Sequence, residues 1–380
     1  MTLHLDFETV ATVDLRRTGV YRYAEDPDTD VILACYTDTG DAQTWRPGMP
    51  IPERIEQAVK TGETIHAWNA QFEYVLWTEV LCRKYMWPKP NLRQFDCAMA
   101  RALYWGYPGS LGLCSQVMGH GYHKNAVGHA LMLRMCRPRS FAANGRPVFW
   151  HTQDAVKYDE LEAYCKDDVY AERACTDRLP PLPSYERNLW VLDQTMNSKG
   201  VPVDSKLVAA MTTLATDAQN ALDTAMYAIT GGQVSGPNAT AALLNWLTGE
   251  GANLPDLRKE TVKEAIRLLP NCPVRDALML RRDGARASVA KLQAFAEAVC
   301  KDGTVKGMLR YYGAGRTGRW SGAGGAKVQP HNLVRGTITG VDHAIEMILG
   351  GCSPADLELL FEDSALGVIA SCMRGCFSCL

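Results

Sequence analysis

Apolar and polar side chains alternate strictly along residues 3–8, which predicts a strand with one face toward a core. Apolar runs and helical periods predict the other elements of the first 180 residues: strands at 31–36 and 64–68, and helices at 70–85 and 155–178. Strands that alternate with helices indicate an α/β domain over residues 1–180.

The proline-rich segment 181–184 predicts a linker, because proline cannot continue a helix. After it the periodicity is helical, and five helices are expected: 185–199, 205–230, 240–248, 260–269 and 273–300. We therefore expect a helical region at 185–302. A last region, 303–380, begins with a glycine-rich polar stretch and ends with a helix and a cysteine-rich tail.

The composition is that of a globular protein, with 380 residues, 47% hydrophobic and 22% charged. No apolar run approaches the roughly 20 residues of a membrane span, so no membrane association is expected. Asp6 and Glu8 stand where a signal peptide would be apolar. The thirteen cysteines are an odd number and widely spread, which favours free thiols in a reducing cytoplasm.

Positive charge is concentrated in the second half of the chain. Residues 256–335 contain sixteen Lys and Arg but seven Asp and Glu. Such an excess is typical of a surface that binds a polyanion, because Lys and Arg release counterions from phosphates. On charge alone, a solvated basic face explains it equally well.

Asp6 and Glu8 are two residues apart on the first predicted strand, so both side chains project from one face. Two carboxylates about 4 Å apart repel each other by about 4 kcal/mol at an effective dielectric constant of 20. A hard divalent cation such as Mg²⁺ or Mn²⁺ removes this repulsion. Two solvated acids on an edge strand are the alternative.

Two further elements carry acids. Glu73 lies in the first turn of a helix that follows a strand, with Asn69 as the expected N-cap, and the helix dipole favours an anion there. Tyr164 and Asp168 are four residues apart and share one helix face, where a phenol beside a carboxylate can orient a water molecule. His66, at the end of the preceding strand, could be a metal ligand but is interpreted as a buried, hydrogen-bonded histidine.

Together, D-x-E, N-x-x-F-E and Y-x-x-x-D resemble the three exonuclease motifs of the DEDD family, with glutamate (Glu73) in place of the usual second-motif aspartate. The resemblance implies an RNase H-like fold and two Mg²⁺ (or Mn²⁺) ions. It implies that Asp6 bridges both ions and that Glu8 and Asp168 complete the metal sites. Glu73 would act through water or the second ion, and Tyr164 would position the attacking water.

A second segment, YYGAGRTGRWSG followed by VQPHNLVR, resembles the T-G-R and Q-N-L-P-R segment of phage-type, DNA polymerase I-like (family A) DNA polymerases. In this chain His331 replaces a glutamine and Val334 a proline. The resemblance implies a helical thumb at 185–302 and the start of a palm at 303–380. The residues it implies for contacts with DNA are Arg316, Thr317, Arg319, Gln329 and Asn332.

The family's catalytic palm strand, D-[FY]-S-x-I-E-x-R, has no match here, so a chain that ends before the polymerase active site is expected. The leading hypothesis is a proofreading 3'→5' exonuclease that acts on DNA in a bacterial or phage-infected cytoplasm. The alternatives are a non-catalytic DNA-binding half of a split polymerase, completed by a separate palm and fingers chain, and an RNA-trimming nuclease. In the tail, Cys372, Cys376 and Cys379 have the C-x-x-x-C-x-x-C spacing of iron–sulfur sites, or belong to the family's L-R-[GS]-x-F stretch.

Overall fold

A computed structural model describes residues 2–119, 121, 126–285, 291–315, 317–322, 333 and 335–377. The chain forms two compact units. The first comprises residues 1–200 and 300–327, and the second comprises 201–299 and 328–380. Each unit contains its own hydrophobic core.

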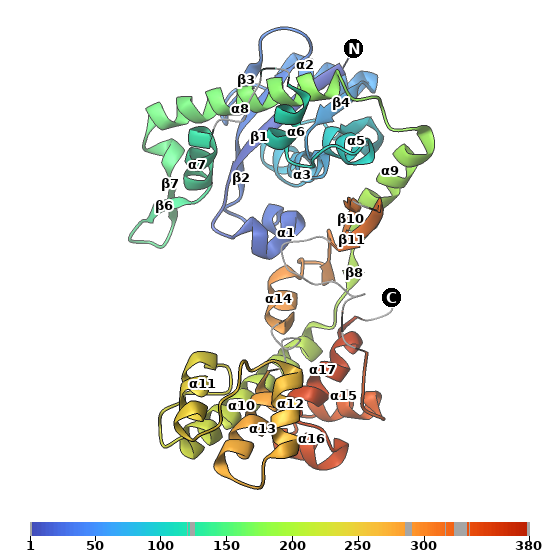
Figure 1. Cartoon of the computed structure of the whole chain (residues 1–380). Helices are drawn as coiled ribbons and strands as arrows, with labels where there is room; N and C mark the ends of the chain where they lie inside the picture. Colours follow the sequence, from blue (N-terminus) through green and yellow to red (C-terminus); the bar gives the residue numbers. More distant parts are fainter. Residues whose placement is uncertain are drawn as a thin grey trace. The chain divides into compact units, whose positions relative to one another are not determined.

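The first unit is built around a five-stranded sheet with the order β3-β2-β1-β4-β5, so that β1 is central (Figure 1). Its strands are β1 (Thr2–Val10), β2 (Asp30–Thr37), β3 (Gln43–Trp45), β4 (Thr64–Ala67) and β5 (Phe95–Cys97). β2 pairs antiparallel with β1 and β3, whereas β4 runs parallel to β1 and β5. The predicted strands at 3–8, 31–36 and 64–68 are all present.

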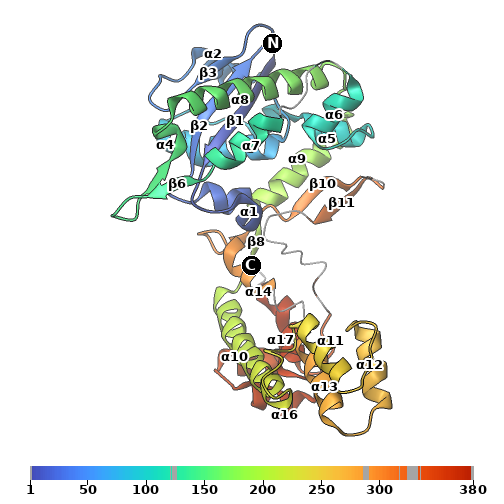
Figure 2. The same ribbon diagram turned by 60° about the vertical axis from the view of Figure 1, so that its left-hand side comes forward.

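Helices surround this sheet, and the longest, α8, crosses one face of it (Figure 2). The helices of the first unit are α1 (Leu15–Ala24), α2 (Glu53–Thr61), α3 (Ala70–Leu76), α4 (Cys82–Tyr85), α5 (Ala98–Tyr104), α6 (Leu111–Met118), α7 (Ala126–Met135), α8 (Ala155–Thr176) and α9 (Ser184–Lys199). A π-helical turn, Trp77–Leu81, joins α3 to α4, so the helix predicted at 70–85 is continuous but not wholly α-helical. A small hairpin of β6 (Pro138–Phe141) and β7 (Pro147–Phe149) precedes α8.

The alternation in β1 separates the core from the candidate chemistry. Leu3, Leu5 and Phe7 are buried in the main core, where the Phe7 ring contacts Trp77 at a centroid distance of 6.1 Å. The intervening polar side chains face α8, because successive side chains of a strand point to opposite faces. The same pattern that predicts the strand therefore places its carboxylates beside α8.

A buried polar cluster ties β1 to α8. His4 Nδ1 lies 2.7 Å from Glu172 Oε2, and the Thr176 hydroxyl donates to Glu172 Oε1 at 2.6 Å. Both His4 and Glu172 are almost fully buried. Since His4 is two residues before Asp6 and Glu172 is four after Asp168, this cluster sets the spacing of the two elements that carry the acids.

The second unit consists mainly of helices around a separate core. Its elements are β8 (Val201–Pro202), α10 (Ser205–Ile229), α11 (Thr240–Gly249), α12 (Lys259–Leu268), α13 (Pro273–Gly284), α14 (Lys291–Ala298), α15 (Val341–Leu349), α16 (Pro354–Phe361) and α17 (Ala365–Cys372). The Asp204 side chain caps α10 by accepting from the Leu207 N–H at 2.9 Å. The helix predicted at 273–300 is two helices, and residues 286–290 between them lie outside the described residues.

The unit boundaries differ from the predicted domain boundaries at 180–184 and 302. Trp190 and Val191 of α9, together with Tyr311, are buried in the core of the first unit. Tyr311 belongs to β10 (Leu309–Ala314), which pairs antiparallel with β11 (Arg319–Gly322), and β9 (Thr304–Val305) precedes them. The glycine-rich stretch therefore contains a hairpin that packs with the N-terminal unit.

Two expectations from composition concern the whole chain. Among the described residues, no helix is both long and apolar enough to cross a membrane. The twelve cysteines in the described part of the chain are all free thiols, as predicted.

The buried cluster around Glu172 generates a stability prediction. Glu172→Ala leaves the buried His4 ring and Thr176 hydroxyl without their acceptor, which costs about 1–3 kcal/mol for each group left unpaired. Urea unfolding should show this loss. Glu160→Ala, an exposed position on the same helix, is the control and should change stability little. Equal effects of the two substitutions would contradict the role of the cluster.

Candidate active site

Asp6 and Glu8 lie together on β1, as the D-x-E spacing predicts. Each offers a carboxylate oxygen within 4.8 Å of the other and of the Cys165 sulfur. The Cys165 thiol, on α8, donates to Asp6 Oδ2 at 3.5 Å and faces the Asp6 carbonyl oxygen at 3.6 Å. Glu8 is 7% exposed, so this pair of acids is only partly solvated.

A cavity of about 410 Å³ opens on these acids, and we call it the carboxylate cavity. It lies within the first unit and receives side chains from β1, α1, α3, α7 and α8. Its lining includes all five residues predicted from the three motifs: Asp6, Glu8, Glu73, Tyr164 and Asp168. The structure therefore brings these residues together, while their catalytic roles remain predictions.

Glu73 is held in the first turn of α3, where the strand-to-helix junction places it. It is 4% exposed, and its Oε2 has no hydrogen-bond partner among the described residues. Burial, together with the negative charge of Asp6, raises the pKa of the Glu73 carboxyl well above its usual range. Asn69 occupies the N-cap position of α3 as predicted, although its side chain makes no capping hydrogen bond.

Tyr164 stands beside the acids of both β1 and α8. Burial and the nearby carboxylates, first that of Asp168 and then that of Glu8, raise its pKa. The phenol therefore keeps its proton and serves as a hydrogen-bond donor. Gly128 of α7 packs closely against the ring, where a Cβ atom would lie 2.3 Å from Tyr164 Cδ2.

Sequence reasoning missed several residues of this site. The carboxylate cavity is also lined by His129 and Arg137, while Cys165 lies beside Asp6 and Gly128 packs against Tyr164. None of these four residues belongs to a recognised motif. Arg137 also forms an ion pair with Asp14 at 3.2 Å. Cys165 directly follows Tyr164, but only the packing of α8 against β1 brings its sulfur to Asp6.

His66 does not line the carboxylate cavity and is a buried residue, as predicted. Its ring stacks on that of His4 with a centroid distance of 4.7 Å. Burial lowers its pKa to about 4, so the ring is neutral near pH 7. Its Nδ1 has no hydrogen-bond partner within the described part of the chain.

The donor set fits a hard divalent cation. Five carboxylates line one cavity, those of Asp6, Glu8, Asp14, Glu73 and Asp168, and Glu73 Oε2 is a buried oxygen without a donor among the described residues. Oxygen ligands of this kind suit Mg²⁺ or Mn²⁺. Cys165 is a poor additional ligand, because burial first and the neighbouring groups second raise the pKa of its thiol.

The predicted DNA-contacting residues lie in and after the β10–β11 hairpin. Thr317 and Arg319 are exposed there, next to Gly318. Gly318 has φ +63°, and a Cβ atom would lie 2.8 Å from the Tyr312 ring, so glycine is required at the turn. Arg316, Gln329 and Asn332 lie outside the described residues.

The tail cysteines are buried where the structure describes them. Cys372 and Cys376 are fully buried in the second unit, and the Cys376 sulfur lies 3.5 Å from the Met211 sulfur. Burial raises the pKa of Cys372 to about 11 and that of Cys376 to about 12, which disfavours the thiolates that metals bind. Cys379 lies outside the described residues.

Comparisons with known proteins agree with the resemblance to polymerases. The chain is 33% identical over 371 residues to the DNA polymerase of Bacillus phage SP02, which covers 95% of this chain and 55% of that protein. The POL domain of Pol1 from M. smegmatis, solved in complex with DNA primer-template and dNTP, has a similar structure, with a TM-score of 0.50. That match has 14% identity and covers 86% of this chain and 52% of the other. No protein-family model matches the chain.

By fold and site, the chain combines an α/β unit that carries an acidic cavity with a helical unit. The relationship to the phage enzyme identifies it more closely: the chain is family A DNA polymerase-like. It spans about half the length of the phage DNA polymerase and of the Pol1 domain.

The burial of Glu73 generates a pH-dependent prediction. Its raised pKa means that the folded protein holds this proton to a higher pH than the unfolded chain does. The associated stability is present at low pH and is lost as the pH rises. Glu73→Gln removes the titration, so in EDTA the variant should gain thermal stability over the wild type at pH 8 more than at pH 5.

Thermal unfolding at the two pH values, with the exposed Glu53→Gln as control, measures this difference. A gain from Glu73→Gln that is the same at both pH values would show that burial of the charge is not its cause.

Proposed function

We propose that the first unit is a divalent-metal-dependent 3'→5' exonuclease that acts on DNA as the proofreading part of a family A DNA polymerase. The observation that carries the proposal is the convergence of Asp6, Glu8, Glu73, Tyr164 and Asp168 on one cavity from three separate elements. A chance grouping of four buried or half-buried acids would be costly, because each carboxylate raises the energy of the others.

The fold supports this proposal. A central β1 in the order 3-2-1-4-5, with β2 antiparallel and β4 parallel to it, is the strand arrangement expected of an RNase H-like sheet. β1 carries the first pair of acids, the end of β4 leads into the helix of Glu73, and α8 brings Asp168 across the sheet face.

The residues divide the chemistry between them. When bound, two divalent ions supply stabilisation of the attacking and leaving oxygens of an in-line displacement. Asp6, Glu8 and Asp168 would hold them, and Glu73 would act through water or the second ion. Tyr164 keeps its proton and donates a hydrogen bond, which orients the attacking water and the scissile phosphate. The expected product is a nucleoside 5'-monophosphate.

The relatives support a DNA substrate and a replicative role. A phage DNA polymerase matches most of the chain, and the similar solved structure holds primer-template DNA. The exposed Thr317 and Arg319 of the β10–β11 hairpin would contact DNA phosphates and the minor groove. A separate palm and fingers chain stays a prediction.

Removal of the acids tests the proposal. Asp6→Ala combined with Glu8→Ala should lower the rate of hydrolysis of 5'-labelled single-stranded DNA in Mg²⁺ by roughly 10³-fold, since metal ions supply several kcal/mol of transition-state stabilisation. Tyr164→Phe should lower it by about 10²-fold. The exposed Glu56→Ala and Tyr185→Phe are the matched controls and should keep the wild-type rate.

Full activity of the double alanine variant would refute the assignment of the site. An RNA oligonucleotide of the same sequence serves as the second substrate, and faster hydrolysis of RNA than of DNA would favour the RNA-trimming alternative.

A further inference from the structure

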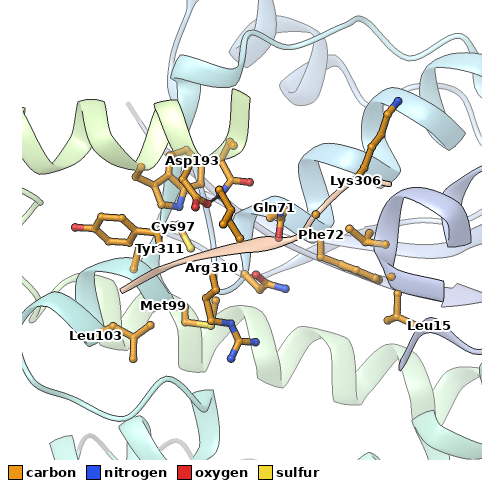
Figure 3. A pocket seen from close by; sticks show the side chains of 18 of the residues that line it. Leu15, Gln71, Phe72, Cys97, Met99, Leu103, Asp193, Lys306, Arg310 and Tyr311 are labelled. Carbon is orange, nitrogen blue, oxygen red and sulfur yellow. Dashed lines mark hydrogen bonds between the residues drawn. The ribbon is translucent and has the colours of Figure 1, made fainter. Parts of the chain in front are cut away.

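Two different regions border the carboxylate cavity. On the side of α1 and α3 lies a second cavity of about 360 Å³, whose lining includes Leu15, Phe72, Asp193 and Tyr311 (Figure 3). Its buried acid, Asp193, is bonded within the protein, where it accepts from the Tyr311 N–H among other donors. On the side of α7 the border is formed instead by exposed positive charge.

A long stretch of the first unit contains no acid. Residues 97–153 contain six Lys and Arg and no Asp or Glu. Four of the six are arginines that lie between the last turn of α7 and the end of the β6–β7 hairpin: Arg134, Arg137, Arg139 and Arg146. All four side chains are exposed. Positive charge is therefore concentrated beside the carboxylate cavity as well as in residues 256–335.

The hairpin that carries Arg139 and Arg146 has a defined turn. The Ala142 N–H donates to the Arg146 carbonyl oxygen at 2.9 Å, and the Arg146 N–H donates to Asn144 Oδ1 at 3.1 Å. Gly145 has φ +78°, a conformation that favours glycine. The hairpin projects from the body of the first unit (Figure 2). Its side chains are thus held in place and are accessible to a large partner.

Three cations of the described chain lie against the ring of Trp150, which directly follows β7. The guanidinium carbons of Arg134 and Arg139 each lie 5.0 Å from the ring centroid, and Lys157 Nζ lies 5.9 Å from it. The three charges are therefore at most about 11 Å apart, close to the Debye length of about 10 Å in 0.1 M salt, so their fields add. Asp154 pairs with Lys157. Neither arginine forms an ion pair with an acid in the described part of the chain.

An exposed aromatic ring accompanies these cations. Phe141, the last residue of β6, is 63% exposed. Aromatic rings among exposed arginines form a surface that suits single-stranded nucleic acid, because the cations contact phosphates and the rings stack on bases. The bases of a duplex already stack on each other, so the ring favours a single strand.

This basic surface is continuous with the carboxylate cavity. Cys136 and Arg137 line that cavity, and Pro138, directly after them, begins β6. A further cavity of about 640 Å³, between α7 and α8, is lined by both Arg134 and Tyr164. Since Tyr164 also lines the carboxylate cavity, a strand that ends at the acids can continue over α7 onto the hairpin.

We propose that Arg134, Arg139, Arg146 and Phe141, which we call the hairpin surface, bind single-stranded DNA whose 3' end lies in the carboxylate cavity. The proposal rests on the proposed exonuclease function and extends it to nucleotides beyond that cavity. The arginines contact successive phosphates, and Phe141 stacks on one base. Neither contact depends on the identity of the base, so the hairpin surface holds a strand of any sequence.

The salt dependence of binding tests the arginines. Affinity of the full chain for fluorescent oligothymidylates of 4 and 12 nucleotides, each with a non-hydrolysable 3'-terminal linkage, is measured by anisotropy in Ca²⁺ over a series of KCl concentrations. Arg139→Gln combined with Arg146→Gln should weaken binding of the 12-mer roughly 10-fold in 0.1 M salt. It should also reduce the slope of log affinity against log salt by about 1.4, since each phosphate contact to a single strand contributes about 0.7.

The 4-mer should bind this variant as it binds the wild type, because it ends within the carboxylate cavity. Arg139→Lys combined with Arg146→Lys keeps both charges and should keep the wild-type slope for the 12-mer.

The aromatic contact has a separate test. Phe141→Ala should weaken binding of the 12-mer about 5-fold or more through lost stacking, and it should leave the salt slope unchanged. The controls are Lys60→Gln combined with Arg178→Gln, and Tyr185→Ala, all at exposed positions elsewhere in the first unit. They should keep both the affinity and the slope of the wild type.

The outcomes separate the two proposals. An unchanged salt slope in the glutamine variant, or a loss that is equal for the 4-mer and the 12-mer, overturns the hairpin surface even if hydrolysis depends on Asp6 and Glu8. Hydrolysis that ignores Asp6 and Glu8, together with the expected change of slope, overturns the exonuclease and leaves DNA binding by the hairpin supported. A larger loss for a 12-base-pair duplex than for the single strand overturns the choice of a single strand.

Discussion

Repulsion among the carboxylates of Asp6, Glu8, Glu73 and Asp168 is the constraint on which the first unit depends. Acids this close and this poorly solvated oppose folding unless a proton or a cation neutralises them. The apolar face of β1, packed on Trp77 and the rest of the core, supplies the opposing stabilisation. The fold therefore stores an electrostatic cost along its central strand, which a bound divalent cation would relieve.

The sequence predicts only those parts of this arrangement that depend on short-range periodicity. Alternation over residues 3–8 predicts β1 and the shared face of Asp6 and Glu8, because the period of a strand is local. The spacing of Tyr164 and Asp168 likewise predicts a common helix face. Only the resemblance to the DEDD family predicts that these two elements meet the helix of Glu73. No local rule brings residues 6, 73 and 168 together.

Other features escaped prediction because packing over long range decides them. Cys165 contacts Asp6 only after α8 crosses β1. Residues 309–322 look like a polar glycine-rich loop, yet they form a hairpin whose Tyr311 is buried and hydrogen-bonded to Glu186 at 2.6 Å. Asp193 has the sequence context of a solvated helical acid, and its burial follows from the packing of α9 in the first core.

The two neighbouring cavities both contain buried acids, but the charge of those acids is neutralised in different ways. In the carboxylate cavity several acids share one space, and a bound divalent cation would neutralise them together. In the cavity lined by Leu15, Phe72, Asp193 and Tyr311, a single buried acid accepts hydrogen bonds from the neutral Gln194 and Asn197 amides, and burial raises the pKa of Asp193 to about 7. Phe72 and Arg16 border both spaces, so the two arrangements lie side by side along walls that α1 and α3 supply.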